Sequence, residues 1–316
     1  MPTTLITTPT FARYSREPWT LLEDAGAGPV RPVEDAALPR PELLARVGTA
    51  DALIVGMDPI TAEVVEAADR LKVIAKHGVG VDTIDLAAAR ARGIRVTYAP
   101  GSNSRAVAEF TFGLVLDAAR RITEADARLR AGGWPKLFGP ELAGKTLAII
   151  GFGRIGRLLA GYAQAFGMTV LAHDPYLPDA EITARGARPA SLADCLAGAH
   201  FTSLHLPADP GAPPLLDAAA LRSTRPGSYL INAARGGLVD EDALAGLLVE
   251  GHLAGAAVDA FASEPLGDGP LRAAPNVVLT PHMAACSHEA NREMGVMVAE
   301  DVVRVLAGEE PRHEAP

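Results

Sequence analysis

The stretch that decides the fold reads Leu147-Ala148-Ile149-Ile150-Gly151-Phe152-Gly153-Arg154-Ile155-Gly156-Arg157-Leu158-Leu159. An apolar, strand-like run stops at a glycine cluster, and a helical pattern follows at once. Gly151 permits a tight turn, Gly153 lets phosphates approach the backbone, and Gly156 lets the new helix pack on the strand. The N-terminus of that helix presents unpaired N–H groups to an anion. We therefore predict a dinucleotide-binding turn made of Gly151, Gly153, Arg154, Ile155 and Gly156.

An acidic residue follows the next predicted strand. A second apolar run covers residues 168–172 and leads into His173 and Asp174, about 18 residues beyond Gly156. The Asp174 carboxylate can accept hydrogen bonds from an adenosine ribose diol, and it would repel a ribose 2′-phosphate. No Arg follows in the next few positions. The predicted cofactor is therefore NAD rather than NADP.

Length, charge and cysteine content limit the classes of protein to which this chain can belong. A chain of 316 residues suits two domains that each bury a core. The formal net charge of -9 argues against non-specific binding to nucleic acid or to an anionic membrane. Cys195 and Cys286 form no CxxC pair, which indicates two reduced thiols in a cytoplasmic protein. We expect neither a signal peptide nor a transmembrane segment.

Short apolar runs alternate with helical patterns along most of the chain, which predicts parallel strands with right-handed crossovers. In the first hundred residues the expected strands are 4–8, 29–33, 52–56, 72–75 and 94–98, and the expected helices include 61–68 and 85–92. We predict an α/β fold with two doubly wound parallel-sheet domains. Residues 1–100 and 287–316 would form a discontinuous, flavodoxin-like substrate domain. Residues 101–286 would form a Rossmann cofactor domain.

Two long helical patterns are expected to link these domains. The first, residues 105–130, follows a breaker-rich segment, ends at Gly132 and Gly133, and would bridge the domains. Trp134 is expected in the core at the interdomain hinge. The second, residues 287–306, should cross back and pack on the N-terminal domain.

Three chemically active residues follow consecutive predicted strands of the second domain. Arg235 follows strand 228–231, Glu264 follows strand 255–258, and His282 follows strand 277–280. The carboxyl ends of parallel strands share one edge of a sheet, where ligands bind. Near neutral pH a His can donate a proton to a developing alkoxide and take it back. A Glu would orient that imidazole, and an Arg would grip a substrate carboxylate with two hydrogen bonds.

Other histidines fit this role less well. His205 also ends a predicted strand, but that strand should lie beside the adenosine half of the cofactor. The remaining histidines show no spacing typical of metal ligands, so we predict no metal site.

The chain resembles the D-isomer-specific 2-hydroxyacid dehydrogenase family, closest to its short phosphoglycerate-dehydrogenase-like members. The matching segments, in the family's order along almost the whole chain, are residues 77–82, 151–156, 232–240, 258–265 and 280–282. The resemblance implies that Arg235, Glu264 and His282 form a catalytic triad. It also implies a homodimer built largely through the cofactor domains.

The resemblance further implies a set of binding residues. Those lining the cofactor would be Asp174, Leu206, Pro207, Ala233, Asp259 and Val107. Those contacting the substrate would be Arg235, main-chain groups of Val79 and Gly80, and Asn103 near the nicotinamide, with Lys76 as a further anion contact.

Two departures leave the substrate open. The long serine-biosynthetic members carry a regulatory domain after the catalytic core, whereas this sequence stops at Pro316. Gly56-Met57-Asp58 stands where some phosphoglycerate-specific members place a phosphate-binding Arg. We therefore expect an NAD-dependent oxidoreductase that interconverts a small D-2-hydroxy acid and its 2-keto acid, either phosphoglycerate dehydrogenase-like or hydroxypyruvate/glyoxylate reductase-like. The direction of flux is left open.

Two alternatives remain. The first is an NAD(H)-gated dimeric co-regulator with little catalysis. The second is a phosphite-type dehydrogenase. The formate-oxidising branch lacks the Glu of the triad, so Glu264 argues against that branch.

Overall fold

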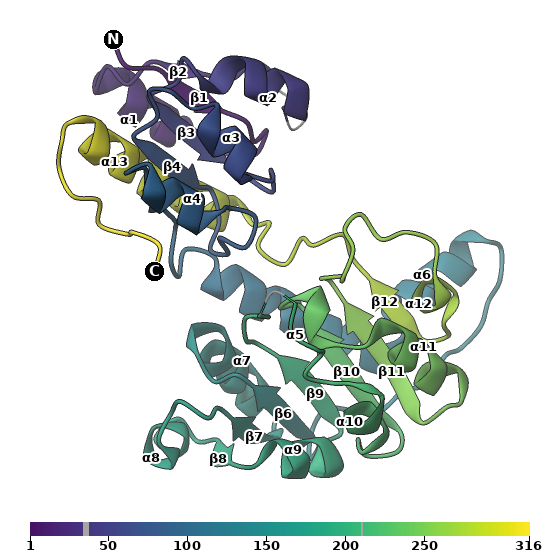
Figure 1. The fold of residues 1–316 in the computed structure, drawn as a ribbon. Coiled ribbons are helices and arrows are strands. Elements are labelled where there is room, and N and C mark those ends of the chain that lie inside the picture. Colours follow the sequence, from purple (N-terminus) through teal and green to yellow (C-terminus); the bar gives the residue numbers. More distant parts are fainter. Residues whose placement is uncertain (34–37, 210) are drawn as a thin grey trace. The chain divides into compact units, whose positions relative to one another are not determined.

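The computed structural model describes residues 1–33, 38–209 and 211–316, and these divide into two compact units (Figure 1). Unit 1 comprises Met1–Asn103 and Cys286–Pro316, and unit 2 comprises Ser104–Ala285. Each unit is built on its own parallel sheet. The predicted fold class of two doubly wound parallel-sheet domains is therefore confirmed.

The sheet of unit 1 has the strand order β2-β1-β3-β4-β5, with every pair parallel. This is the flavodoxin-like order. The strands are β1 (Thr4–Ile6), β2 (Pro29–Val30), β3 (Ala52–Val55), β4 (Val73–Lys76) and β5 (Arg95–Thr97). The helices are α1 (Glu17–Asp24), α2 (Arg40–Val47), α3 (Ala62–Glu66), α4 (Leu86–Ala91) and α13 (His288–Leu306).

Alternate residues of these strands face opposite sides of the unit 1 sheet. Leu53 and Val55 belong to a core cluster with residues of α2, α3 and α4, whereas Ile54, which lies between them, does not. Helix α13 contacts α1 and β4, so the end of the chain completes a unit that the beginning of the chain starts. Ser287 caps α13 by accepting a hydrogen bond from the Ala290 N–H at 3.0 Å.

The sheet of unit 2 has the order β12-β11-β10-β9-β6-β7-β8, again with every pair parallel. Its strands are β6 (Thr146–Ile150), β7 (Thr169–His173), β8 (Arg188–Pro189), β9 (Phe201–Leu204), β10 (Ser228–Asn232), β11 (Leu253–Val258) and β12 (Val277–Leu279). The direction of winding reverses between β6 and β9. In such sheets this switch point is where a dinucleotide binds.

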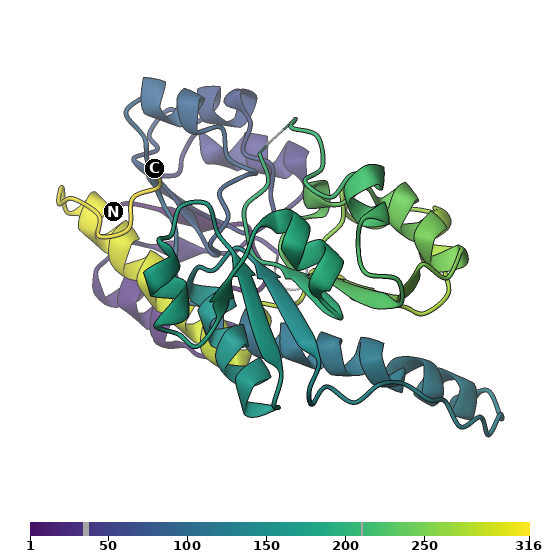
Figure 2. The same cartoon turned by 90° about the horizontal axis from the view of Figure 1, so that it is seen from below.

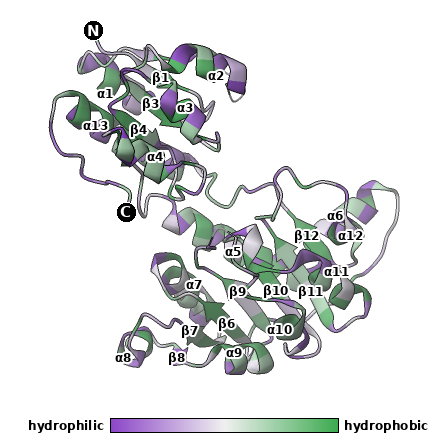
Figure 3. Cartoon of the chain, viewed as in Figure 1, coloured by the Kyte–Doolittle hydropathy of each residue, from purple (hydrophilic) through white to green (hydrophobic). Residues whose placement is uncertain are grey.

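Helices cover both faces of the unit 2 sheet. They are α5 (Ser104–Arg120), α6 (Ile122–Arg130), α7 (Arg154–Ala165), α8 (Asp179–Thr183), α9 (Leu192–Gly198), α10 (Ala218–Arg222), α11 (Glu241–Val249) and α12 (Pro270–Ala273), with a 3₁₀ turn at Gly236–Leu238. Leu147 and Ile149 of β6 pack in one core cluster, with residues of α5 and α7. Ala148 and Ile150 pack in the other, with residues of α9 and α11. The central strands are accordingly among the most hydrophobic parts of the unit (Figure 3).

The single helix expected over residues 105–130 is wrong, because the structure has two helices there. Arg121 adopts a left-handed conformation with φ +55° and separates α5 from α6. The Asp117 carboxylate accepts hydrogen bonds from the N–H and the hydroxyl of Thr123, and it thereby caps the new helix. Helix α5 packs against α7, whereas α6 buries none of its residues.

Trp134 does not lie in a core, so that expectation is also wrong. Its exposed fraction is 83%, and that of Phe138 in the same loop is 87%. The segment of α6 and residues 131–141 extends away from the sheet at the edge of unit 2 (Figure 2). We call this segment the α6 arm. Residues 131–136 around Trp134 are exposed as well, so its indole lies at the surface of unit 2.

Within the described residues, no helix is both long enough and apolar enough to cross a membrane.

Candidate active site

The glycine turn between β6 and α7 is shaped by close backbone contacts. Gly151 has φ +93°, and a Cβ placed there would lie 2.3 Å from the carbonyl oxygen of His205, just after β9. A Cβ on Gly156 would lie 2.4 Å from the carbonyl oxygen of Gly151. No side chain fits at either position. A Cβ on Gly153 would meet nothing within 4 Å, so this glycine leaves open space beside the N-terminus of α7.

The turn therefore fits a dinucleotide. Arg154 and Ile155 form the first turn of α7, where backbone N–H groups have no partner within the helix. Gly153 and Arg154 are exposed, so phosphate oxygens can reach these groups. Backbone atoms crowd Gly151 and Gly156, whereas Gly153 leaves open space in front of the twelve-residue helix α7. This arrangement matches what a pyrophosphate requires.

Asp174 lies directly beside this turn. Its carboxylate accepts hydrogen bonds from the N–H groups of Phe152 at 2.9 Å and Tyr176 at 3.0 Å. The Gly151 N–H donates to the carbonyl of His173 at 2.8 Å, which fixes the turn against the end of β7. Each carboxylate oxygen keeps a lone pair for a further donor. The structure thus brings Asp174 and the glycine turn together, as a ribose contact would need.

The other residues expected around the cofactor lie near the same edge or on α5. Leu206 and Pro207 follow β9, and Ala233 follows β10, and all three are at least partly exposed. Val107 is buried on α5 with an exposed fraction of 7%. Their contacts with a cofactor remain predictions.

Arg235 is presented by a loop that Asn232 holds in shape. The Asn232 side chain donates to the carbonyl of Arg235 at 2.8 Å and accepts from the Ala234 N–H at 3.1 Å. Gly236 packs against the backbone of Phe261, since a Cβ there would lie 1.8 Å from the Phe261 carbonyl carbon. The Arg235 loop and the loop after β11 are therefore in direct contact.

Glu264 and His282 form a pair. The Nδ1 atom of His282 lies 2.8 Å and 2.9 Å from the two carboxylate oxygens of Glu264. The Phe261 N–H donates to Glu264 Oε1 at 3.0 Å and so fixes the carboxylate. Because an ionised carboxylate only accepts, Nδ1 carries the hydrogen and Nε2 is the nitrogen left for proton exchange. Both side chains are partly exposed, at 34% for His282 and 28% for Glu264.

Asp259 braces the loop that carries His282. Its carboxylate accepts hydrogen bonds from the Thr280 hydroxyl at 2.6 Å, the Met283 N–H at 2.9 Å and the Ala284 N–H at 2.9 Å. Asp259 is only 1% exposed. These hydrogen bonds tie the end of β11 to residues 280–284, and the contact of Asp259 with the cofactor stays a prediction.

Sequence reasoning missed two residues of this site, Asn232 and Glu241. Asn232 ends β10, and its backbone carbonyl also accepts from the Asp259 N–H at 2.9 Å. Glu241 begins α11 and accepts from the Ala262 N–H at 2.6 Å. A polar Asn at the end of an apolar strand could have indicated the role of Asn232 from the sequence. Nothing local in the sequence indicated the contact that Glu241 makes.

His205 has an environment unsuited to proton transfer near neutral pH. Its Nε2 lies 2.8 Å from the Ser203 hydroxyl, and burial lowers the pKa of the imidazole to about 4. The ring is therefore neutral in the range where a general acid must be charged.

The residues expected to contact substrate from unit 1 lie around the carboxyl ends of its strands and at its boundary. Val79 and Gly80 are partly exposed in the loop after β4, and Asn103 is the last residue before unit 2. Lys76 is only 4% exposed, and its ammonium donates to the Gly56 carbonyl and the Thr83 hydroxyl. Lys76 as an anion contact stays a prediction, because its ammonium already has acceptors within unit 1.

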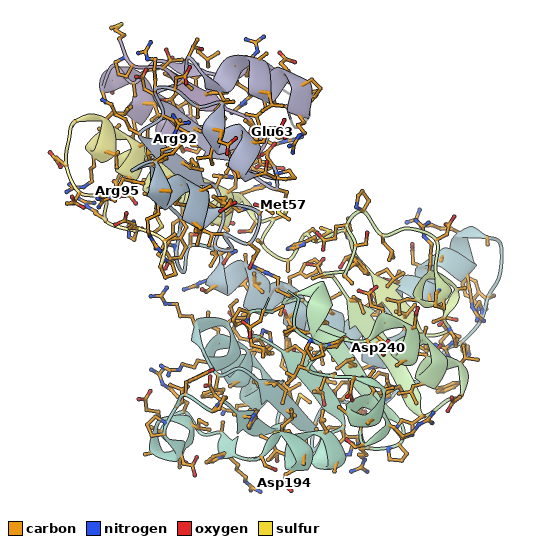
Figure 4. All side chains as sticks on the ribbon, in the orientation of Figure 1. Met57, Glu63, Arg92, Arg95, Asp194 and Asp240 are labelled. Atoms are coloured by element: carbon orange, nitrogen blue, oxygen red, sulfur yellow. The ribbon has the colours of Figure 1, made fainter. Side chains whose placement is uncertain are left out.

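The segment after β3 carries no cation. Met57 is exposed in this segment (Figure 4), and the Asp58 carboxylate is buried. Asp58 accepts hydrogen bonds from the Thr7 hydroxyl at 2.8 Å and the Gly56 N–H at 3.0 Å.

Among the described residues, no group of three or more His, Cys, Asp or Glu side chains is arranged to hold a metal ion.

These features define the class of dinucleotide-binding α/β proteins whose strand ends carry an Arg and a Glu–His pair. The chain belongs to the D-isomer specific 2-hydroxyacid dehydrogenase family, because the pattern of that family's NAD binding domain matches residues 112–284. The family resemblance read from the sequence is confirmed.

Individual relatives agree with this assignment. The chain is 47% identical over 273 residues to D-3-phosphoglycerate dehydrogenase of Mycobacterium leprae, a match that covers 85% of this chain and 52% of that protein. It is 42% identical over 288 residues to glyoxylate reductase of Thermofilum pendens, covering 86% and 83%. The crystal structure of the TT0316 protein from Thermus thermophilus has a TM-score of 0.88 at 39% identity and covers 99% of both chains. The chain thus spans about half the length of its phosphoglycerate dehydrogenase relatives.

Proposed function

We propose that the protein is an NAD-dependent oxidoreductase that interconverts a small D-2-hydroxy acid and its 2-keto acid. The observation that carries this proposal is the Glu264–His282 pair, whose two short contacts hold the imidazole by Nδ1. The pair follows strands β11 and β12, and Arg235 follows the neighbouring strand β10. Membership of the 2-hydroxyacid dehydrogenase family supports the same activity.

Each residue has a distinct task in this proposal. Bound NAD supplies or accepts the hydride. His282 donates a proton from Nε2 to the oxygen of the keto group and takes it back in the oxidative direction. Glu264 stabilises the charged imidazole and keeps its ring in the required orientation. The Arg235 guanidinium binds the substrate carboxylate with two hydrogen bonds and polarises the adjacent carbonyl.

The proposed cofactor site consists of the glycine turn and the strand ends around it. Its residues are Gly151, Gly153, Arg154, Ile155, Gly156, Asp174, Leu206, Pro207 and Ala233, with Val107 and Asp259 near the nicotinamide. Asp174 favours NAD, because a carboxylate that already binds the turn would repel a ribose 2′-phosphate.

The proposed substrate is a small 2-keto acid, phosphorylated or not. One relative is a D-3-phosphoglycerate dehydrogenase and another is a glyoxylate reductase. The neutral and acidic residues after β3 favour an unphosphorylated acid, since a phosphate is usually held by Arg or Lys. Val79, Gly80 and Asn103 are the proposed contacts from unit 1.

We also propose a cytoplasmic homodimer that associates through unit 2. The exposed aromatic side chains of the α6 arm support this, because large apolar side chains exposed together mark interaction surfaces. Burial raises the pKa of the Cys195 thiol to about 12, and a buried, reduced thiol of this kind suits a reducing compartment.

The decisive test is a screen of NADH oxidation with glyoxylate, hydroxypyruvate, pyruvate, phosphohydroxypyruvate and bulkier 2-keto acids. We expect turnover with at least one small 2-keto acid, and none with the same acid when NADPH replaces NADH. NADH affinity is measured in parallel by fluorescence. Tight NADH binding with no turnover on any acid would contradict the enzyme proposal and favour the NAD(H)-gated co-regulator.

A further inference from the structure

Glu241 makes an unusual contact for the first residue of a helix. It begins α11, but the cap of that helix is the preceding residue, Asp240 (Figure 4), whose side chain accepts from the Ala243 N–H at 3.0 Å. The carboxylate of Glu241 is thus not needed to cap the helix. It accepts instead from the Ala262 N–H at 2.6 Å, across a separation of 21 residues.

Ala262 belongs to the turn that fixes Glu264. The N–H groups of the adjacent residues Phe261 and Ala262 donate to two different carboxylates. The Phe261 N–H binds Glu264, which in turn holds His282. The Ala262 N–H binds Glu241, which is anchored in α11. A shift of this turn would therefore move the Glu264 carboxylate and the imidazole that it holds.

The turn is also held by the Arg235 loop. Gly236 allows no Cβ, since one would lie 1.8 Å from the carbonyl carbon of Phe261 and 2.1 Å from the Ala262 nitrogen. The turn is thus held by backbone packing on the Arg235 loop and by one hydrogen bond to α11. The packing of Gly236 limits how closely the Arg235 loop approaches the turn at residues 261–264. The hydrogen bond from the Ala262 N–H to Glu241 is directional, so it also sets the orientation of the turn.

The electrostatic surroundings of Glu241 oppose its charge. Burial raises the pKa of Glu241 above its usual value, and the nearby charges of Asp242 and Glu264 raise it further. Only the hydrogen bond from the Ala262 N–H lowers it. A solvated acid in the first turn of a helix would avoid the loss of hydration. This carboxylate is partly buried close to Glu264, and the Ala262 N–H of the turn donates a hydrogen bond to it.

We propose that Glu241 is a positioning residue for the Glu264–His282 pair: its carboxylate holds the turn at residues 261–264 in the geometry that aims the imidazole at the substrate. This inference rests on the proposed function, because it assigns Glu241 to the same site. Glu241 acts through the turn, and its effect is on the rate of the chemical step rather than on cofactor binding.

The test compares three variants of the full chain. Glu241→Ala removes the acceptor, Glu241→Gln keeps an oxygen that can accept from Ala262, and Asp242→Asn removes a charge from the same helical turn without touching residues 261–264. We expect kcat to fall about tenfold in Glu241→Ala, which corresponds to the loss of one hydrogen bond. We expect Glu241→Gln and Asp242→Asn to stay within about twofold of the parent, and NADH affinity to be unchanged in all three.

A second readout does not depend on activity. Hydrogen exchange of the peptide that covers residues 259–265 should be faster in Glu241→Ala than in the parent or in Asp242→Asn. If the parent chain turned over no keto acid, the proposed function would fail, and the exchange experiment would still test whether Glu241 holds the turn. A Glu241→Ala variant with the kcat and exchange of Asp242→Asn would overturn the inference. A Glu241→Gln variant as slow as Glu241→Ala would also overturn it, since charge rather than the hydrogen bond would then matter.

Discussion

The backbone conformation of His282 is unusual and is maintained by its neighbours. It has φ +49°, in the left-handed region that residues other than glycine seldom occupy. Its N–H donates to the Thr280 carbonyl at 3.0 Å, and Asp259 binds residues on both sides of it. The surrounding hydrogen bonds thus maintain a conformation that the residue alone would avoid. The side chain is thereby held against Glu264.

We predict that His282→Asn lowers kcat by about a hundredfold or more. The Asn side-chain amide cannot act as a general acid near neutral pH, but Asn tolerates the left-handed conformation better than most residues. NADH affinity and thermal stability should therefore change little. Steady-state kinetics and NADH fluorescence titration check this. Undiminished turnover would remove His282 from the mechanism.

A second prediction concerns the pH dependence of stability. Burial, with smaller contributions from the charges of Lys76 and Arg31, lowers the pKa of His77 to about 4 from its usual 6.5. His77 is only 7% exposed. Because the unfolded chain binds this proton more tightly, protonation favours unfolding. The stabilisation is complete above pH 6.5 and is lost as the pH falls towards 4, by about 3 kcal/mol at most.

Urea unfolding of the parent and of His77→Gln between pH 4 and pH 8 measures this effect. The variant has no imidazole to titrate, so its free energy of unfolding should fall less steeply between pH 6.5 and pH 4. Carboxylates contribute equally to both proteins. Parallel curves would show that His77 does not control the acid sensitivity.

At the scale of elements, the turn between β6 and α7 depends on which atoms approach each glycine. Gly151 and Gly156 are closed in by backbone, whereas Gly153 faces open space. The sequence spacing assigns all three glycines to one motif. Only the structure separates the two glycines that backbone contacts require from the one beside which a side chain would have room.

This difference leads to a prediction on paired variants. Gly151→Ala should lower the free energy of unfolding by about 3 kcal/mol, because its φ is +93° and its Cβ would clash with the His205 carbonyl. Gly153→Ala should leave stability within about 0.5 kcal/mol, because nothing lies near its Cβ, but it should weaken NADH binding. Denaturant unfolding and NADH titration distinguish the two. Equal stability of both variants would contradict the contact argument.

At the scale of the whole molecule, the α6 arm stands out as an exposed apolar surface of unit 2. Helix α6 buries no residue, and Ile122 and Leu129 of this helix are 56% and 52% exposed. Trp134 and Phe138 extend the apolar surface into the following loop. A surface of this kind is rarely stable in water unless it is covered.

We therefore predict that the chain is a dimer in solution, with twice the mass of the 32.8 kDa protomer. The double variant Trp134→Ser, Phe138→Ser should dissociate at micromolar concentration, since it removes two large apolar anchors. Tyr176→Ser is the matched control, because Tyr176 is 93% exposed in unit 2 outside the arm. Light scattering after size exclusion measures the mass. A monomeric parent chain would contradict the dimer.

Much of the fold and part of the site could be predicted because their signals are local. Glycine spacing, alternation of apolar runs with helical patterns, and the residue that follows each strand can all be read over a few positions. Since parallel strands bring their carboxyl ends to one edge, this local information placed Arg235, Glu264 and His282 on adjacent strand ends. The left-handed break at Arg121 could not be predicted in this way, because the helical pattern continues through it.

The sequence by itself thus determined the two parallel α/β sheets, the dinucleotide turn and the family to which the chain belongs. The tertiary structure alone decided that Asp259 braces the His282 loop, that Glu241 holds the turn beside Glu264, and that Trp134 is exposed. The physical reason is that these features depend on contacts between residues that are far apart in the chain, or on the lack of such contacts. A backbone N–H finds a distant carboxylate only once strand order and loop packing have brought the two together.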